Sequence, residues 1–165
     1  MKVKRFVFSS SSSVYGDAKT PTPEEHKTNP ISPYALNKLI GEQYCKLYSD
    51  IYNLDTVCLR YFNVYGNRMN NEGGYKLVFP IFKEQLLNNK PLTINNDGKQ
   101  RRDFIHVDDI VRADMFGGEK QYGNITIEPF ETLADTSKID LYLNFQPKNK
   151  LKTWISTFTE QSSTE

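Results

Sequence analysis

The sequence predicts an α/β fold built on a parallel sheet. Short apolar segments typical of strands alternate with segments in which apolar residues recur every three or four positions, as they do in helices. Strand-like segments at 3–8, 56–62 and 103–106 are separated by helix-like segments that begin at Pro33 and near residue 77. Strands joined by helical crossovers run parallel, so this alternation favours a parallel sheet.

The first half of the chain is predicted to run strand, loop, helix. Residues 3–8 form a short strand, and the serine run at 9–13 is a structured loop, because Val14-Tyr15-Gly16 follows directly. Residues 17–33 contain four prolines and form a surface loop. Ser32 can cap a helix that starts at Pro33, where proline is favoured. The helix continues to about residue 50 on the periodicity of its apolar residues, which are Leu36, Ile40, Tyr44, Leu47 and Ile51.

The middle of the chain continues the alternation after the strand at 56–62. Residues 63–74 are predicted to be a loop, and residues 77–88 a second helix. Residues 92–94 form a short strand that leads into an Asn-Asp-Gly turn at 96–98. A further short strand is predicted at 103–106.

A third helix is predicted to open at Val107. Asp108 and Asp109 then lie at its N-terminal end, where negative charge is favourable. The pattern weakens after Met115, and a short helix is predicted at 150–160.

Length, charge and cysteine content restrict the class of protein. The chain has 165 residues, one domain's worth, and its 21 basic and 20 acidic residues give a net charge of +1. This balance argues against a protein that binds nucleic acid through bulk charge. No apolar run approaches the roughly 20 residues of a membrane span, so no membrane association is expected. Cys45 and Cys58 provide neither a disulfide framework nor metal-ligand spacing, so we expect no metal and a cytoplasmic location.

Tyr34 and Lys38 are the first candidates for chemistry. Their spacing of four places both on one face of the predicted helix. A tyrosine hydroxyl has a pKa near 10 and is a poor base at neutral pH, but a neighbouring ammonium lowers that pKa. The pair can therefore act as an acid/base unit. The alternative is a solvated helix face, because a tyrosine-rich chain contains this spacing by chance.

Two further residues have a functional and a structural interpretation. Ser11 lies 23 residues before Tyr34, at the end of a predicted strand, where side chains line the crevice of an open α/β sheet. It could hydrogen-bond the oxygen that is deprotonated, or simply cap local backbone. Arg102 could hold a phosphate with its planar guanidinium, or lie on a solvated turn.

Motifs in a fixed order carry a family resemblance. They are Phe6–Gly16, Ser32–Lys38, Leu59–Gly66 and Arg102–Asp109. Together they resemble the extended short-chain dehydrogenase/reductase family, and specifically its nucleotide-sugar epimerases. The resemblance covers residues 3–115 almost continuously and resumes at Leu133–Lys138 and Phe145–Lys148.

The resemblance implies a fold and a reaction. The fold would be a partial Rossmann-like, doubly wound parallel sheet with a reduced substrate-binding subdomain. Residues 1–115 would be the second half of the catalytic domain with part of the substrate region, and residues 116–165 a shortened substrate-domain remnant and tail. The function would be that of an NAD-dependent nucleotide-sugar 4-epimerase, which oxidises C4 of a UDP-sugar reversibly and returns the hydride to the other face.

Site residues follow from motif position within the resemblance. Tyr34 would be the catalytic acid/base, Lys38 would lower its pKa and hold the nicotinamide ribose, and Ser11 would hydrogen-bond the sugar hydroxyl. The remaining positions are implied as contacts to the cofactor (Tyr61, Phe62), to the nucleotide diphosphate (Asn63, Arg102) and to the uridine (Val78, Thr93, Ile94, Asn95).

The resemblance also implies that part of the family's fold is absent. The Gly-x-x-Gly-x-x-Gly turn that seats the cofactor pyrophosphate does not occur in this sequence, and strand edges and apolar faces would be exposed. Whether the chain is an enzyme therefore stays open. It could be a fragment of a longer protein, one piece of a split enzyme that pairs with a complementing cofactor-binding chain, or a non-catalytic remnant that binds a nucleotide sugar or a partner protein. The resemblance also implies a homodimer, because members of the family commonly dimerise through the helices that correspond to the one carrying Tyr34 and the one near residues 77–88. A dehydratase or reductase is a further alternative, but Ser11-Ser12-Ser13 replaces the acid pair of the dehydratases and favours an epimerase.

Overall fold

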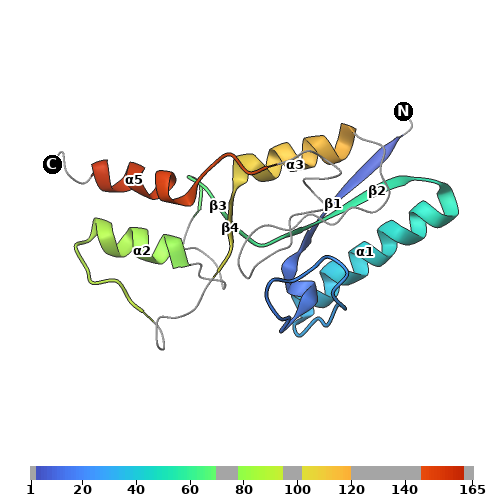
Figure 1. The fold of residues 1–165 in the computed structure, drawn as a ribbon, viewed down its shortest axis with the longest axis horizontal. Helices are drawn as coiled ribbons and strands as arrows, with labels where there is room; N and C mark the ends of the chain where they lie inside the picture. The colour runs from blue at the N-terminus through green and yellow to red at the C-terminus, as the bar shows by residue number, and fades with distance from the viewer. Residues whose placement is uncertain (1–2, 70–77, 95–101, 120–145, 162–165) are drawn as a thin grey trace.

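The computed structural model describes residues 3–69, 78–94, 102–119 and 146–161 (Figure 1). The elements in chain order are β1 (Arg5–Ser11), η1 (Ser12–Tyr15), α1 (Pro33–Tyr52), β2 (Asp55–Tyr61), β3 (Asn63–Tyr65), α2 (Val78–Leu87), β4 (Phe104–His106), α3 (Val107–Glu119) and α5 (Leu151–Gln161). No helix within these ranges has the length and apolar content needed to cross a membrane.

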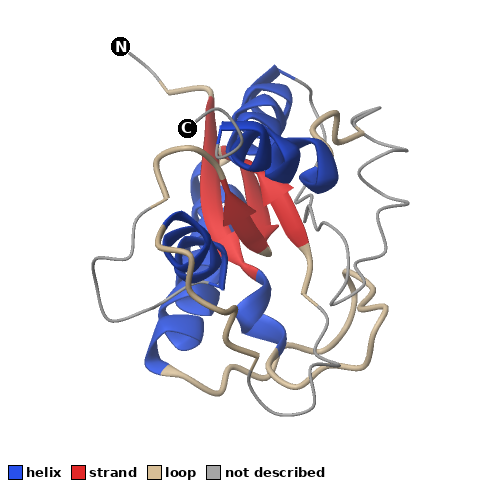
Figure 2. Ribbon diagram, turned by 90° about the vertical axis from the view of Figure 1, so that its left-hand side faces the viewer, coloured by secondary structure: helices blue, strands red, loops and turns tan. Residues whose placement is uncertain are grey.

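Strands β1 and β2 form a parallel pair joined by the α1 crossover. The register runs from Arg5 opposite Asp55 to Ser11 opposite Tyr61. Helices α1 and α3 both contact the two strands and lie on opposite sides of them (Figure 1). The turned view shows the strands enclosed by helices (Figure 2). The predicted α/β class and parallel pairing are therefore confirmed.

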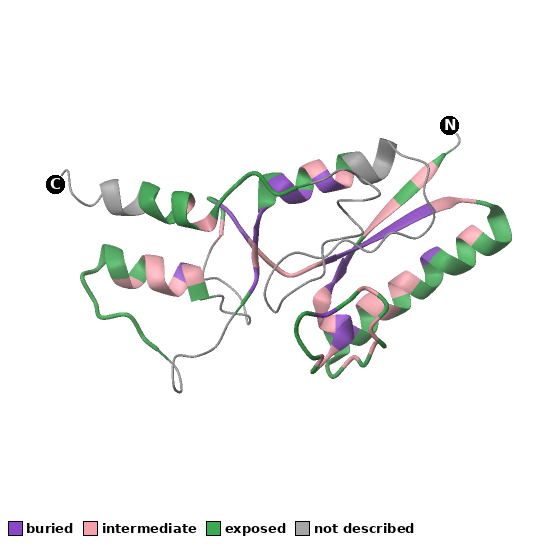
Figure 3. Cartoon of the chain, viewed as in Figure 1, coloured by how far each residue is buried: buried purple, intermediate pink, exposed green. Residues whose placement is uncertain are grey.

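Strand β2 is the centre of the core. Residues 56–60 are all buried, and Val57 and Leu59 are almost completely so. A strand covered by helices on both faces has an uninterrupted apolar run, which explains why Val57-Cys58-Leu59 shows no alternation. Ala35 of α1 and Ala113 of α3 are fully buried, since small side chains let both helices approach the strands. Figure 3 shows this buried band along β2.

Local capping residues determine where helix α1 begins and ends. Ser32 Oγ accepts a hydrogen bond of 3.1 Å from the backbone N–H of Ala35, and Pro33 occupies the first helical position. Asn53 ends the helix in the left-handed conformation, with φ of 52°. The predicted helix from Pro33 to about residue 50 is confirmed.

The apolar stripe of α1 does not face the strands. Its members are exposed by 38–61%, and Figure 3 shows much of α1 in the colour of exposed residues. Ala35 and Cys45 are instead the buried residues of this helix. The periodicity thus predicted the helix correctly but marks a second, uncovered face (Leu36, Ile40, Tyr44, Leu47 and Ile51).

Two short segments differ from the sequence prediction. Residues 63–65 were predicted to be loop, but they form β3, which pairs in parallel with β4 in a register that places Val64 opposite Ile105. Residues 92–94 were predicted to be a strand and are not one. Thr93 instead bonds to Gln85 of α2, whose amide donates to Thr93 Oγ1 at 2.6 Å and accepts from its N–H at 3.1 Å. These side-chain bonds take the place of strand pairing at Thr93.

An aromatic cluster joins β3, β4, α2 and α5. Tyr65 lies with its ring centroid 4.9 Å from that of Trp154 and 5.0 Å from that of His106. Phe79 of α2 contacts Phe104 at 4.5 Å. Tilted and edge-on contacts at these distances add to the stabilisation from burial.

A buried carboxylate fastens the chain before α5 to helix α3. Asp109 is completely buried and accepts bonds from the backbone N–H groups of Lys148 at 3.1 Å and Asn149 at 3.0 Å. Its second oxygen also accepts from Asn149 Nδ2 at 3.1 Å, and Arg112 forms an ion pair with it. Helix α3 itself runs across the predicted domain boundary at residue 115, so the division at that residue stays a prediction.

We expect Asp109→Asn to destabilise the chain by about 2–4 kcal/mol, because an amide would turn donors toward the N–H groups that the carboxylate accepts from. Urea unfolding followed by circular dichroism measures this loss. Asp108→Asn is the matched control, since the neighbouring Asp108 side chain is 72% exposed. Equal stability of the two variants would contradict the role assigned to Asp109.

Candidate active site

The end of β1 and the first turns of α1 bring Tyr34 and Lys38 together. Lys38 Nζ donates a 2.8 Å hydrogen bond to the carbonyl oxygen of Ser9 and lies 5.6 Å from the centroid of the Tyr34 ring. Tyr34 is 57% exposed, so its hydroxyl is accessible. An ammonium has three N–H donors, and one bond to Ser9 leaves others for a ligand. The site therefore presents a phenol and a cation on one accessible surface.

Ser11 lies at the C-terminal end of β1, as predicted, and it also caps η1. Its Oγ accepts from the Ser13 N–H at 3.2 Å and from Ser13 Oγ at 2.9 Å. Both the functional and the capping interpretation of Ser11 thus have support. In these bonds Ser11 Oγ is the acceptor, which leaves its own O–H to be donated to a ligand.

A buried ion pair lies behind these residues. Arg60 of β2 donates to both carboxylate oxygens of Glu42 in α1, from Nε at 2.8 Å and from Nη2 at 2.7 Å. Both side chains are about nine-tenths buried. Burial is the largest single influence and would lower the pKa of the Arg60 guanidinium, but the hydrogen bonds and charge interactions with Glu42 and Tyr15 together outweigh it and the pKa is raised. The guanidinium is therefore a permanent charge within the core.

Tyr61, predicted as a cofactor contact, uses its hydroxyl within the protein. The hydroxyl donates to Asp114 of α3. Burial, and then this bond, raise the pKa of the Tyr61 phenol. A ligand would therefore meet the ring or backbone of Tyr61 rather than a free hydroxyl. Phe62 follows directly, between β2 and β3, and is partly buried.

Four of the residues predicted to contact the nucleotide lie on or beside β3, β4 and α2. Asn63 Nδ2 donates to the carbonyl of Asp103 at 2.8 Å, which places Asn63 beside the start of β4 and the exposed Arg102. Val78 opens α2, while Thr93 is tied to that helix by Gln85. Ile94, also predicted to lie beside the uridine, is 69% exposed. The last predicted residue, Asn95, lies outside the described residues.

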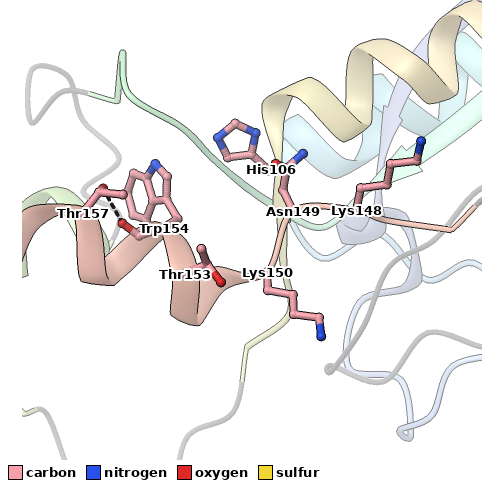
Figure 4. A pocket seen from close by; sticks show the side chains of 7 residues that line it. All are labelled: His106, Lys148, Asn149, Lys150, Thr153, Trp154 and Thr157. Atoms are coloured by element: carbon pink, nitrogen blue, oxygen red, sulfur yellow. Dashed lines mark hydrogen bonds between the residues drawn. The ribbon is translucent and has the colours of Figure 1, made fainter.

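A pocket of about 320 Å³ lies at the start of α5, and none of the residues that line it is a predicted site residue. It is lined by His106, Lys148, Asn149, Lys150, Thr153, Trp154 and Thr157. Figure 4 shows the side chains of Lys148 and Lys150 pointing away from one another, so the two cations do not converge on one ligand. Sequence reasoning did not find this pocket, because its walls come from segments about 40 residues apart. The described residues contain no cluster of His, Cys, Asp or Glu suited to a metal ion.

Comparison with known proteins agrees with this arrangement. The family model described as "NAD dependent epimerase/dehydratase family" matches residues 1–123. The chain belongs to this family.

Individual members of the family resemble the chain closely. The UDP-glucose 4-epimerase of Mycolicibacterium smegmatis is 41% identical over 111 residues, which is 67% of this chain and 35% of that protein. A UDP-N-acetylglucosamine 4-epimerase from Methanobrevibacter ruminantium, solved with UDP-N-acetylmuramic acid, has a TM-score of 0.80 and 31% identity over 93% of this chain and 64% of its own. A UDP-glucuronic acid 4-epimerase from Bacillus cereus, solved with UDP-glucuronic acid and NAD, has a TM-score of 0.81 and 28% identity over 98% of this chain and 63% of its own.

These matches confirm the predicted family and the partial Rossmann-like fold. They also show how much of the relatives the chain spans. Matches to three curated relatives cover 37%, 35% and 50% of their lengths. The reaction and ligands of the whole protein are therefore treated below as proposals.

Two thiols lie between α1 and β2, on the inner side of the helix that carries Tyr34. Cys45 and Cys58 are both free and buried, as the sequence predicted for core thiols. Burial raises the pKa of Cys58, and the neighbouring Cys45 raises it further. Burial likewise raises the pKa of Cys45. Both thiols therefore remain protonated in the folded chain at pH values where an unfolded thiol ionises.

We expect this family member to lose stability as the pH rises above about 8.5, the pKa of an unfolded thiol. The unfolded chain then releases protons that the folded chain keeps, so each buried thiol lowers the unfolding free energy by up to about 1.4 kcal/mol per pH unit. Urea unfolding at pH 7, 8.5 and 10 measures the slope, and Cys58→Ala makes it shallower. Identical slopes for the two proteins would refute the assignment to Cys58.

Proposed function

We propose that this chain carries the catalytic part of an NAD-dependent UDP-sugar 4-epimerase. The observation that carries the proposal is the position of Lys38, bonded to the Ser9 carbonyl at 2.8 Å and lying over the Tyr34 ring at 5.6 Å. The Lys38 ammonium is thereby held beside the ring and keeps N–H donors for a ligand. The family match and the similarity to UDP-sugar 4-epimerases support the same reaction.

In this proposal the reacting proton moves between the substrate and Tyr34. The Tyr34 oxygen takes the proton of the sugar 4-hydroxyl and later returns it. The Ser11 O–H donates to the sugar oxygen and orients it, while the Lys38 ammonium stabilises the negative phenolate. NAD, when bound, supplies reversible hydride acceptance at C4.

The residues available at the site fit this cofactor and substrate. Lys38 has N–H donors left for the nicotinamide ribose, and Tyr61 and Phe62 offer aromatic surface nearby. Asn63 and Arg102, which adjoin at β3 and β4, would hold the nucleotide diphosphate. The segments proposed to lie beside the uridine contain Val78, Thr93, Ile94 and Asn95.

We further propose that a second polypeptide surface completes the site, either a complementing cofactor-binding chain or a second copy. The exposed apolar stripe of α1 supports this, because apolar patches of that kind mark interaction surfaces. A cytoplasmic location is part of the proposal, and the two free thiols support it.

We expect Lys38→Ala to weaken NAD binding at least about tenfold, because the variant loses a charge-assisted hydrogen bond to the ribose. Calorimetric titration of the folded chain with NAD measures this. Lys46→Ala is the matched control: Lys46 lies two turns further along α1, and its partner there is Asp50.

Unchanged NAD affinity in Lys38→Ala would contradict the role of Lys38. If the folded wild-type chain does not bind NAD, the cofactor contacts belong to a second segment, and the same pair of variants is then compared after that segment is supplied from the M. smegmatis relative.

We expect Tyr34→Phe to lower kcat for the conversion of UDP-galactose to UDP-glucose by about 100-fold or more, because the proton acceptor is removed. The assay uses the chain with NAD, supplied with the remaining segment of the relative where the chain alone is inactive. Tyr52→Phe is the control, since Tyr52 is a 68% exposed tyrosine at the end of the same helix and lies outside the apolar stripe.

Normal turnover by Tyr34→Phe would disprove the assignment. Binding of UDP-galactose without turnover by the completed wild-type protein would instead favour the non-catalytic binding function.

A further inference from the structure

Three consecutive residues of β1 meet three positions of α1 at close range. The ring of Phe8 packs so tightly on Gly41 that a Cβ atom at position 41 would overlap with it. The carbonyl of Ser9 accepts from Lys38 at 2.8 Å. The hydroxyl of Ser10 donates to the carboxylate of Glu42. Together these contacts determine how far α1 lies along β1 and how it is rotated.

Glu42 also connects β1 and α1 to the next strand. Arg60, which lies opposite Ser10 in the β1–β2 register, donates to both oxygens of Glu42 at 2.7–2.8 Å. The guanidinium lies 4.6 Å from the centroid of the buried Tyr15 ring of η1. One carboxylate therefore holds three elements around a single point, and a planar, bidentate pair permits little rotation.

The cluster of Ser10, Glu42 and Arg60 adjoins the proposed catalytic residues in both β1 and α1. Ser10 precedes Ser11 in β1, and Glu42 follows Lys38 by one helical turn. Both side chains of the ion pair are about nine-tenths buried, so they are positioned to orient the site rather than to contact a ligand.

We propose that Ser10, Glu42 and Arg60 are positioning residues that hold α1 in the one register on β1 in which Lys38 lies between the Ser9 carbonyl and Tyr34. The inference rests on the proposed function of Tyr34 and Lys38. It adds that the orientation of Lys38 depends on a bond made by the neighbouring residue of β1.

The chain offers an ion pair that serves as a matched control. Arg5 and Asp55 pair at the opposite end of the same two strands, where the register begins. Losing that pair also weakens β1–β2, but it leaves the contacts at Ser9 and Ser10 in place. The variants Ser10→Ala, Glu42→Gln and Asp55→Asn therefore separate loss of position from loss of stability.

The test is the acylation rate of Lys38 by an N-hydroxysuccinimide ester in the full chain, read by peptide mass spectrometry. The rate is expressed relative to that of Lys46, whose side chain is 66% exposed. We expect Ser10→Ala and Glu42→Gln to raise this ratio at least about threefold, because the bond to the Ser9 carbonyl is no longer maintained. Asp55→Asn should leave the ratio unchanged.

An unchanged ratio in folded Ser10→Ala would overturn the inference, as would an equal rise in all three variants. Ser10→Ala keeps the Glu42–Arg60 pair, so it decides the question if Glu42→Gln does not fold. The labelling ratio needs no turnover. Failure of the proposed function therefore appears as absence of epimerisation, and failure of this inference appears as an unchanged ratio.

In a preparation that turns over UDP-galactose at saturating NAD, Ser10→Ala should lower kcat about tenfold with little change in the KM for UDP-galactose, because the residues proposed to hold the nucleotide of the substrate stay in place while the proton acceptor is displaced. A variant that raises KM at unchanged kcat would overturn the positioning role. Asp55→Asn again provides the comparison.

Discussion

The buried pair of Glu42 and Arg60 is the interaction on which the first part of the molecule depends. Removing two charges from water costs several kcal/mol per ion, and only close geometry with further hydrogen bonds offsets that cost. Here the carboxylate receives two bonds from the guanidinium and one from Ser10. Separating the two side chains would leave each charge buried without its partner, so β1, α1 and β2 keep one mutual arrangement.

A second buried carboxylate has a similar role in the other part. Asp109 collects donors from the segment that precedes α5, and so brings that helix against β3 and β4. The rings of Tyr65 and Trp154 then pack beside His106. Helix α3 contacts both strand pairs, which makes it the element that joins the two parts. The bond from Tyr61 to Asp114 belongs to this junction, which is why that hydroxyl is occupied.

The sequence was most informative where the determining contacts are local. The start of α1 depends on Ser32 and Pro33, and the meeting of Tyr34 with Lys38 depends on one helical turn, so both could be predicted. Strand β3 could not be, because three residues acquire strand geometry only by pairing with β4, about 40 positions later. The strand predicted at 92–94 failed for the converse reason, since a side chain of α2 occupies its polar groups.

The site shows the same division between local and distant contacts. Motif spacing indicated Ser11 at the end of β1 and the pair of Tyr34 and Lys38 in the first turns of α1. It gave no signal for Glu42 and Arg60, because a buried ion pair leaves no periodic trace in the chain. The pocket at the start of α5 was also missed, because its walls come from distant segments that the hydrogen bonds of Asp109 to residues 148 and 149 bring together.

Helix α1 carries both the proposed catalytic pair and the exposed apolar stripe on which a second polypeptide is proposed to bind. One face carries Tyr34 and Lys38 and meets β1 through Gly41, about one turn further along the helix, while another face exposes Leu36 and Ile40. Covering each large apolar side chain would contribute up to about 1.5–3 kcal/mol. A partner seated on that stripe would therefore bind the same rigid helix whose register sets the position of Lys38. Any shift of α1 on β1 would move this stripe and the pair of Tyr34 and Lys38 together, so the proposed assembly and the proposed catalysis would depend on the same contacts.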